Sequence, residues 1–182
     1  MSLTTSMLTP TFSLHSTEKL AIPYFRSLQA DGLVKYAFCE GDVHDLSSWM
    51  EFLRRADTKV LFVAHNDQAI GHLHLNNWMG YAAMAHFSCL RAYHRYAAAI
   101  GESVWGTISQ WTRTDGTPYL KTVYGLTPVW NKAAVRFLKK VGFEQITIVP
   151  ESSFIACEGV FSDSILSVRT LQVRRSTQVN HG

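Results

Sequence analysis

Residues 123–149, VYGLTPVWNKAAVRFLKKVGFEQITIV, contain the pattern that decides the fold. Apolar residues recur here at the i, i+3, i+4 and i+7 spacing of one helix face, and cations occupy the other face. The apolar positions are Ala134, Phe137, Leu138 and Val141. Asn131 is a residue type that caps helix N-termini, and Gly142 can adopt the left-handed conformation that ends a helix. The stretch therefore predicts a strand, a turn opened at Pro128, an amphipathic helix and a second strand.

The spacing of Asn131-x-x-Ala134 and Gly142-Phe143 resembles the C-terminal motif of the GCN5-related N-acetyltransferase (GNAT) family. In that family a strand, a helix and a Gly-Phe turn flank bound acetyl-coenzyme A (acetyl-CoA). A short amphipathic helix that ends in glycine and an aromatic residue is also common in other α/β proteins. The order of the upstream elements therefore has to decide between the two interpretations.

The N-terminal part of the chain predicts a short strand at residues 11–15 and then two helices. The first helix should begin near Pro23, or be kinked there, and stop by Gly32, because proline breaks a helix interior. The second helix should be capped by Asp42, with Asp45 three residues on. The apolar stripes are Ala21, Tyr24, Phe25 and Leu28 in the first helix, and Leu46, Trp49, Met50 and Leu53 in the second.

Three strands should follow these helices. Residues 59–65 and 69–75 are rich in β-branched and apolar residues, and the Asn-Asp pair between them favours a tight hairpin turn. Residues 76–80 are expected to form a longer turn. A third strand is predicted at residues 84–90.

A helix should then run from residue 97 to residue 111, with Ile100, Val104, Ile108 and Trp111 on its buried stripe. Strands at residues 120–124 and 164–170 complete the order β, α, α, β, β, β, α, β, α, β, β. This is the element order of the GNAT family. The resemblance implies an α/β, three-layer fold with a central mixed, mostly antiparallel sheet of about seven strands flanked by four helices.

Composition favours one globular domain over residues 1–182, with flexible ends at residues 1–10 and 172–182. Hydrophobic residues make up 47% of the chain, which is enough for an ample core, and the formal net charge is +3. No block of Lys and Arg suggests a nucleic-acid or membrane-surface partner. The three cysteines, Cys39, Cys89 and Cys157, are too few and too far apart for a disulfide framework. Because no apolar run approaches the length of a membrane span, we expect a cytoplasmic protein.

The resemblance implies a cofactor site at the start of the helix at residues 97–111. Backbone N–H groups in a first helical turn have no intrahelical partner, and the helix dipole adds positive charge, so this position can hold the pyrophosphate of acetyl-CoA. The family pattern is Gln or Arg, two residues, Gly, one residue, then Gly or Ala. The matching residues are His94, Arg95, Tyr96, Ala97, Ala98 and Ala99. Ala97 thus places a methyl group where the family has its first glycine.

The resemblance also implies that the pantetheine arm of acetyl-CoA pairs with the third strand of the hairpin set. The residues that should border it are Phe87, Ser88, Cys89, Leu90, Asn131 and Phe137. Transfer would proceed by direct attack of a neutral primary amine on the thioester. Many members protonate the leaving thiolate with a tyrosine seven residues after the motif asparagine, and that position here is Leu138. Another group or water would have to supply this proton.

Histidine is the natural general base near neutral pH, and three histidines lie on strands that should border the substrate cleft. Side chains alternate along a strand, so His72 and His74 should share a face with Ile70, and His86 should share a face with Ser88. We therefore name His74, His86 and Asn131 as candidate catalytic residues.

Two other interpretations stay open. Ala97 and Leu138 would also suit a domain of the same fold that binds acyl-CoA or a partner without turnover. The His-x-His pattern near a third histidine could hold a metal ion, although no adjacent carboxylate or cysteine completes such a site. The partners we expect are acetyl-CoA and an amine acceptor that the sequence does not identify. A homodimer is left open, and no nucleic acid or membrane is expected.

Overall fold

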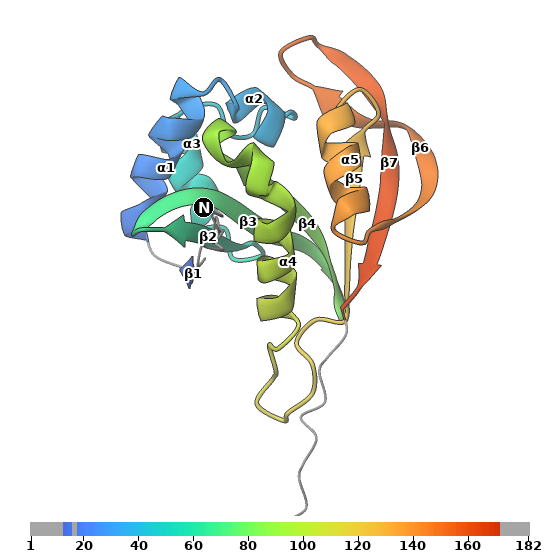
Figure 1. The fold of residues 1–182 in the computed structure, drawn as a ribbon. Helices are drawn as coiled ribbons and strands as arrows, with labels where there is room; N and C mark the ends of the chain where they lie inside the picture. The colour runs from blue at the N-terminus through green and yellow to red at the C-terminus, as the bar shows by residue number, and fades with distance from the viewer. Residues whose placement is uncertain (1–12, 16–17, 172–182) are drawn as a thin grey trace, which may run out of the picture.

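Seven strands form one sheet in the order β1-β2-β3-β4-β5-β7-β6 (Figure 1). The computed structural model describes residues 13–15 and 18–171. All neighbouring strands are antiparallel except β4 and β5, which run parallel. The strands are β1 (Ser13–His15), β2 (Lys59–His65), β3 (Gln68–Met79), β4 (Ala82–Cys89), β5 (Thr122–Pro128), β6 (Glu144–Ile155) and β7 (Val160–Thr170). The predicted mixed, mostly antiparallel sheet is confirmed. Residues 11 and 12 of the expected first strand lie outside the described residues.

Helices pack on the sheet in the predicted order (Figure 1). They are α1 (Glu18–Ala30), α2 (Val34–Ala37), α3 (Leu46–Leu53), α4 (Ala97–Ile108) and α5 (Lys132–Lys140), with a 3-10 helix at Arg91–Tyr96 that leads into α4. The single turn α2 was not predicted. Its apolar stretch is too short to show a helical period.

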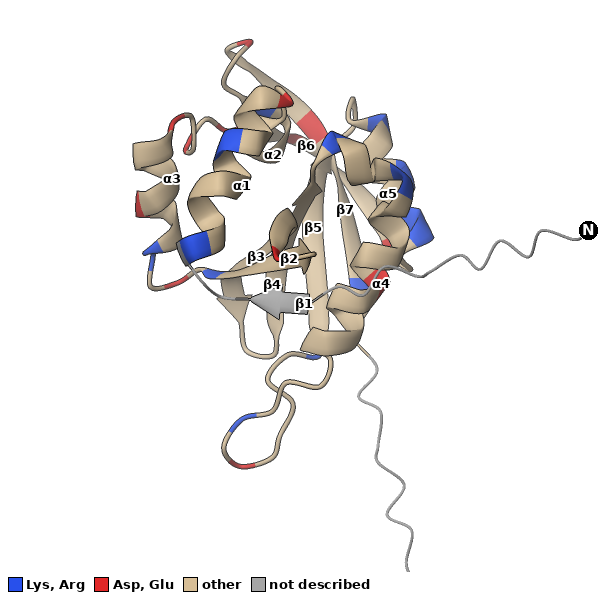
Figure 2. Ribbon diagram, turned by 60° about the vertical axis from the view of Figure 1, so that its left-hand side comes forward, with Lys and Arg blue, Asp and Glu red and all other residues tan. Residues whose placement is uncertain are grey.

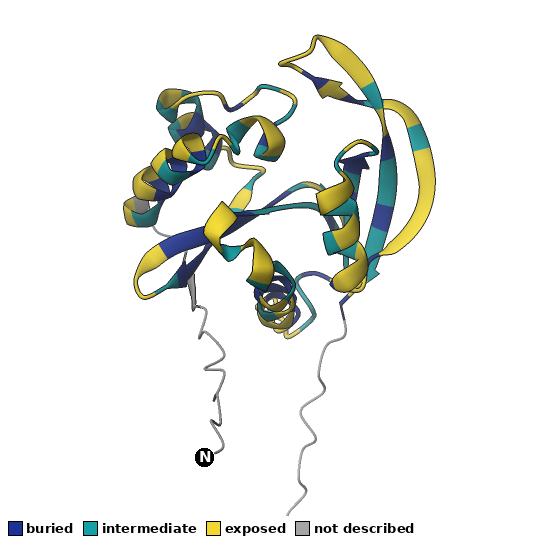
Figure 3. Cartoon of the chain, turned by 45° about the horizontal axis from the view of Figure 1, so that its top comes forward, coloured by how far each residue is buried: buried dark blue, intermediate teal, exposed yellow. Residues whose placement is uncertain are grey.

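Two apolar clusters lie on opposite faces of the sheet. Phe62 of β2 packs with α1 and α3, whereas the next residue, Val63, packs with α4. Adjacent strand residues point to opposite faces, so α1 and α3 cover one face and α4 covers the other. The apolar residues of α5 join the cluster of α4. The edge strand β6 stays exposed along most of its length (Figure 3).

A β-bulge in the hairpin of β2 and β3 changes which residues of β3 share a face of the sheet. Asn66 and Asp67 form the tight turn, both with positive φ, as the hairpin prediction required. The register then shifts between Val63 and Ala64. The extra residue on β3 is Ile70, which consequently packs in the cluster of α4. The prediction that Ile70 shares a face with His72 was therefore wrong.

Helix α1 begins before its proline rather than at it. The helix starts at Glu18 and contains Pro23 in its interior. Proline removes one backbone hydrogen bond, but the apolar stripe of α1 is completely buried, and this burial outweighs the loss. The stripe residues Ala21, Tyr24, Phe25 and Leu28 are all at most 1% exposed. The helix ends as predicted, because Gly32 has φ +65° and Leu33 N–H donates to the Leu28 carbonyl.

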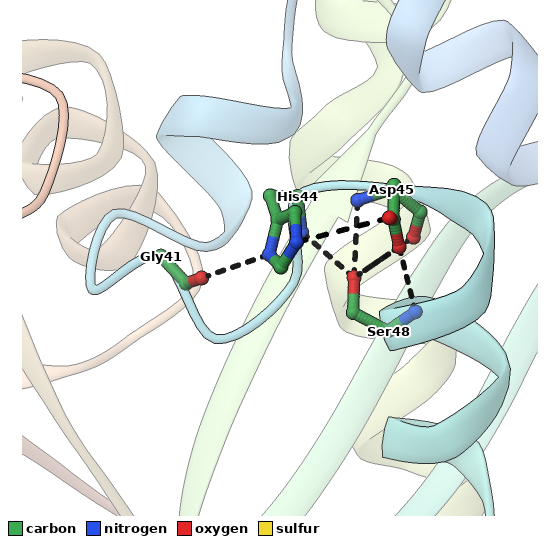
Figure 4. Close-up of polar contacts among 4 residues, drawn as sticks. All are labelled: Gly41, His44, Asp45 and Ser48. Carbon is green, nitrogen blue, oxygen red and sulfur yellow. Dashed lines mark hydrogen bonds and ion pairs between the residues drawn. The ribbon is translucent and has the colours of Figure 1, made fainter.

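The cap of α3 is Asp45, not Asp42. Asp45 accepts from the N–H of Ser48 at 2.8 Å, and the Ser48 hydroxyl bonds back to the cap residue (Figure 4). Asp42 instead forms an exposed ion pair with Arg55 at 3.2 Å. His44 approaches Asp45 at 3.7 Å, but its Nδ1 lies 3.3 Å from the Gly41 carbonyl. Asp45 and Ser48 thus form a capping box, and His44 beside them is not the base of a serine nucleophile.

Two further boundaries differ from prediction. Strand β3 runs through to Met79, so residues 76–80 are mostly strand and the turn lies at Gly80 and Tyr81. Helix α4 ends at Ile108, which leaves Trp111 outside it. The Ser109 hydroxyl donates to the Gly106 carbonyl at 2.8 Å and so competes with continuation of the helix.

The basic residues do not gather in one block. Figure 2 shows Lys and Arg spread over helices and loops, with several on the outer side of α5. No helix among the residues that the structure describes is long and apolar enough to cross a membrane.

Candidate active site

The sheet opens between its two parallel strands. Strands β4 and β5 pair at Ala82↔Thr122, Ala83↔Val123 and Met84↔Tyr124, where their pairing ends. Strand β5 then continues along β7, while β4 continues along β3. Beyond Met84 this edge of β4 has no strand partner among the described residues. Backbone groups there, apart from the Cys89 carbonyl near His94 Nε2, can therefore bind something else.

The alternation of the β3–β4 ladder shows which backbone groups face this opening. The N–H of Leu90 donates to the Ile70 carbonyl at 2.8 Å. In an antiparallel ladder the N–H and C=O of one residue point the same way, and successive residues alternate. Phe87 and Cys89 therefore present their backbone groups to the opening, whereas Ser88 and Leu90 face β3. Of the four strand residues predicted to bind pantetheine, only Phe87 and Cys89 are so placed.

One side of the opening is bordered by packed aromatic rings. The rings of Phe87 and Phe137 stack at 4.8 Å between centroids and 11° between planes. Helices α4 and α5 approach closely here because Gly101 has no side chain. A Cβ at Gly101 would lie 2.9 Å from Val141 Cγ1 and 3.0 Å from Phe137 Cζ. Phe137, which was predicted to border the pantetheine arm, thus lies beside Phe87 of β4.

The predicted pyrophosphate segment lies at the start of α4, which begins at Ala97. His94 Nε2 lies 3.1 Å from the Cys89 carbonyl, and the Arg95 guanidinium lies 4.7 Å from the centre of the Tyr96 ring. The N–H of Ala97 donates to the His94 carbonyl, because the 3-10 helix runs directly into α4. Ala98 is half-buried and Ala99 exposed. This N-terminus is therefore less open to an anion than the family pattern implies.

Asn131 caps α5, as its residue type predicted. Its Oδ1 accepts from the N–H of Ala134 at 3.1 Å. We expect Asn131→Ala to lower the free energy of unfolding by about 1 kcal/mol, and Asn131→Ser to preserve it, because serine caps about as well. Urea denaturation of the two variants measures this difference. An equal loss in both variants would contradict a capping role.

The three histidines lie together on the face of the sheet covered by α1 and α3. In the β3–β4 register His72 is opposite Ser88 and His74 is opposite His86. The rings of His74 and His86 stack at 4.1 Å, and those of His72 and His74 at 5.4 Å. His72 Nε2 lies 3.3 Å from His74 Nδ1, and His86 Nε2 lies 3.2 Å from Asn76 Oδ1. The predicted shared face of His86 and Ser88 is confirmed.

Burial keeps these imidazoles neutral. His72 and His74 are 1% and 3% exposed. Desolvation lowers the pKa of His72 to about 3, and the pKa of His86 to about 4 against an opposing effect of Asp42. The pKa of His74 is also well below its ordinary value, first by desolvation and then by the neighbouring histidines. His72 Nε2 and His74 Nδ1 approach one another, but the faces of His74 and His86 are stacked, so the nitrogens of the three rings do not converge on one point. Among the described residues no group of three or more His, Cys, Asp and Glu is arranged to hold a metal ion.

The rings of His72, His74 and His86 form a row that we call the histidine column. A cavity of about 270 Å³ lies beside it. Carboxyl groups of Glu40 and Asp42 border it, and burial followed by Asp42 raises the pKa of Glu40. Across the cavity, the N–H of Ala156 at the tip of the β6–β7 hairpin donates to the Cys39 carbonyl at 2.8 Å. The lining residues are Ala37, Phe38, Cys39, Glu40, Asp42, Phe52, His74, Asn76, Asn77, Met84, His86, Leu126 and Ser153. Both candidate bases, His74 and His86, therefore reach the cavity.

Sequence patterns did not reveal every polar group of this site. Tyr24 was predicted only as part of the apolar stripe of α1, but its hydroxyl lies 2.8 Å from Ser88 Oγ and 3.1 Å from His72 Nδ1. A tyrosine at the centre of a buried stripe has to find a hydrogen-bond partner, and this was the available signal. Tyr124 donates to the Asn77 carbonyl at 2.8 Å, and burial raises its pKa. Nothing in the sequence marked Cys39 or Glu40.

Comparison with solved structures gives consistent matches. Spermidine N-acetyltransferase from Vibrio cholerae, in complex with CoA and spermine, matches with TM-score 0.68 and 16% identity over 88% of this chain and 95% of that one. The Salmonella typhimurium acetyltransferase that modifies the N-terminal serine of ribosomal protein L7/L12 gives TM-score 0.70 and 12% identity over 89% and 96%. The microcin C7 self-immunity acetyltransferase, in complex with acetyl-CoA and AMP, gives 0.67 and 14% over 87% and 92%. No family model matches the sequence, and a search of curated proteins finds no match.

These neighbours are GNAT acetyltransferases, and their likeness extends over nearly all the described residues. The chain has the GNAT fold. The fold that the Asn131 to Phe143 motif implied is thereby confirmed.

Proposed function

We propose that the chain is an N-acetyltransferase that transfers an acetyl group from acetyl-CoA to a primary amine by direct attack. The observation that carries this proposal is the opening between β4 and β5 next to a cavity with two neutral histidines. The two reactants can thus approach one another through the sheet, with the thioester at the edge of β4 and the amine in the cavity. The solved neighbours support a CoA-type co-substrate.

For acetyl transfer the protein mainly has to position the thioester and the amine and to transfer protons. Backbone N–H groups of Phe87 and Cys89 would pair with pantetheine and polarise the thioester carbonyl. A neutral histidine would take a proton from the ammonium form of the acceptor. Cys89 is not a nucleophile, because burial raises the pKa of its thiol to about 12. An acyl-cysteine intermediate at this residue is therefore not part of the proposal.

The cavity favours a small cationic acceptor or the N-terminus of an extended chain. Glu40 and Asp42 supply negative charge at its border, while Phe38, Met84 and Leu126 supply apolar wall. A cavity of about 270 Å³ admits a short amine and not a folded surface. We propose no single acceptor. A panel of polyamines, amino acid amides and short peptides, assayed by release of free CoA thiol, would identify the class.

A second candidate is a domain that binds acyl-CoA without turnover. It is favoured by Leu138, which cannot donate a proton to the leaving thiolate, and by the N–H of Ala97, which is already bonded. Calorimetric binding of acetyl-CoA with no thiol release on any amine of the panel would favour this candidate over the enzyme.

Placement of the cofactor can be tested at Ala97. We expect Ala97→Glu to weaken acetyl-CoA binding at least tenfold, because it puts a bulky anion where the pyrophosphate should bind at the start of α4. Isothermal titration calorimetry measures the affinity. Ala56→Glu adds the same charge at an exposed residue between α3 and β2 and serves as the control. Unchanged affinity in a folded Ala97→Glu protein would show that the pyrophosphate binds elsewhere.

A further inference from the structure

The hydroxyls of buried Tyr24 and half-buried Ser88 contact His72, at one end of the histidine column. Tyr24, on α1, is 1% exposed, and its hydroxyl lies 2.8 Å from Ser88 Oγ. The same hydroxyl also approaches the Ser88 carbonyl at 3.3 Å. His72 Nδ1 lies 3.0 Å from Ser88 Oγ and 3.1 Å from Tyr24 Oη. His72 is thus held at both nitrogens, by hydroxyls on one side and by His74 on the other.

The contacts of this network fit two proton arrangements. In one, Tyr24 donates to Ser88 Oγ, Ser88 Oγ donates to His72 Nδ1, and His72 carries its proton on Nε2. In the other, Tyr24 donates to the Ser88 carbonyl, which can only accept. Tyr24 Oη is then left to accept the proton of Ser88 Oγ, which is its shortest contact. Both hydroxyl protons are then used, and His72 Nδ1 is the donor in this second arrangement. Because a neutral imidazole has one proton, His72 Nε2 is an acceptor.

The second arrangement extends to His74. Its Nδ1, 3.3 Å from His72 Nε2, has to carry the proton that His72 accepts. His74 Nε2 is then the nitrogen with a free lone pair, and His74 lines the cavity. The opposite arrangement, with the proton on His72 Nε2, would leave His74 Nε2 protonated and unable to act as a base.

We propose that Tyr24 and Ser88 act through His72 as positioning residues that fix the tautomer of His74 and leave its Nε2 as the proton acceptor in the cavity. The kinetic consequences of this inference rest on the proposed function. The reaction balances simply. The acceptor ammonium gives one proton to His74 Nε2, and His74 Nδ1–H continues to donate to His72 Nε2, which stabilises the imidazolium. The neutral amine then attacks the thioester carbon and the C–S bond breaks. The second proton of the attacking nitrogen passes through water to the CoA thiolate, and His74 returns its proton to solvent.

Mostly aromatic rings pack around His72 and His74, and the carboxyl groups of Glu40 and Asp42 border the cavity beside them. Phe38 stacks on both His72 and His74, at 5.6 and 6.0 Å. From α3, Trp49 meets His72 and Phe52 meets His74, both edge-on. The charged groups that affect the column are Arg55 at His74 and Asp42 at His86. The hydroxyl pair and His74 are therefore the hydrogen-bond partners through which the tautomer of His72 is set.

Nitrogen-15 NMR of the imidazole rings tests the tautomers without any substrate. The expected result is that both His72 and His74 carry their proton on Nδ1 at pH 7. In the Tyr24→Phe/Ser88→Ala double variant, His72 Nδ1 loses both acceptors, and a measurable fraction of His74 should move its proton to Nε2. A wild-type His74 with its proton on Nε2 would overturn the inference, even if the protein acetylates amines. Conversely, the expected tautomers in a protein without turnover would overturn only the proposed function.

Kinetics provide the second measurement. The double variant should lower kcat about fivefold to tenfold, the rate equivalent of one buried neutral hydrogen bond, with KM for both substrates unchanged. Ser88→Thr, which keeps a hydroxyl, should retain the wild-type rate. Ser167→Ala is the matched control, since it removes a completely buried serine hydroxyl for which the described residues offer no hydrogen-bond partner. Equal losses in Ser167→Ala and the double variant, or a rise of KM instead of a fall of kcat, would contradict a positioning role.

Discussion

Replacing His74 with glutamine should lower kcat for acetyl transfer by about 10²-fold or more, with acetyl-CoA affinity unchanged. Glutamine can keep a hydrogen bond to His72, but it cannot accept a proton from an ammonium ion near neutral pH. The acceptor amine would then have to lose its proton to water before it enters the cavity. Steady-state kinetics with a reactive amine, together with calorimetric titration of acetyl-CoA, measure the two quantities.

His86→Gln is the matched comparison, because His86 lines the same cavity and stacks on His74 at 4.1 Å. Its Nε2 contacts Asn76, and no hydroxyl pair fixes its tautomer. We expect a smaller loss of kcat, below about tenfold, since only a stacking neighbour is removed. A larger loss in His86→Gln than in His74→Gln would assign the role of base to His86. Raising the pH should partly restore the rate of His74→Gln, because more of the free amine is then already neutral.

The elements that were predicted correctly are those determined by residues close together in the sequence. The helix α5, its cap at Asn131 and its end at Gly142 follow from neighbouring residues, and so does the hairpin turn at Asn66 and Asp67. Strand alternation also predicted that His72 and His74 share a face and that His86 shares one with Ser88, and the β3–β4 register brings the two pairs together. Each of these features depends on contacts within one turn of helix or one pair of strands, which a periodic pattern encodes directly.

Features that depend on distant contacts could not be predicted in this way. The hydroxyl of Tyr24 meets His72 only because α1 packs across β3, and the cavity closes because Ala156 bonds to Cys39 from another part of the chain. The bulge that turns Ile70 to the other face leaves no mark in the alternation itself. The cap of α3 was misassigned because Asp42 and Asp45 are equally suitable residue types, and only the geometry chooses between them.

The free energy of unfolding should fall steeply as the pH drops from about 6.5 to about 4, because the histidines are buried in the neutral form. An unfolded histidine takes up a proton below about pH 6.5, whereas the pKa of folded His72 is about 3 and that of His86 about 4. The unfolded chain therefore binds more protons across this range, and acid favours it. His72 alone accounts for roughly 3 kcal/mol between pH 6.5 and pH 4, since each pKa unit is worth about 1.4 kcal/mol.

Other titrating groups act in different ranges or with the opposite sign. Hydrogen bonds from Ser48 and Thr117 lower the pKa of Asp45 and Asp115, so any stability that these exposed carboxylates add is lost only below their ordinary value of 3.8. The pKa of Glu40 is raised by burial, so protonation of this group favours the folded chain as the pH falls and offsets part of the histidine effect. The window above pH 4 therefore reports mainly on the histidine column.

Urea denaturation of the wild-type chain at pH 7 and at pH 4.5 measures the loss. His72→Gln should be less stable than wild type at pH 7, because it disturbs the hydroxyl pair, yet it should lose distinctly less stability between the two pH values. His44→Gln alters an exposed histidine on the capping loop of α3 and should reproduce the wild-type loss. If His72→Gln lost as much stability as His44→Gln over this range, His72 would have to be protonated in the folded chain. The network that directs the proton of His74 toward a neutral His72 would then not exist near pH 4.5.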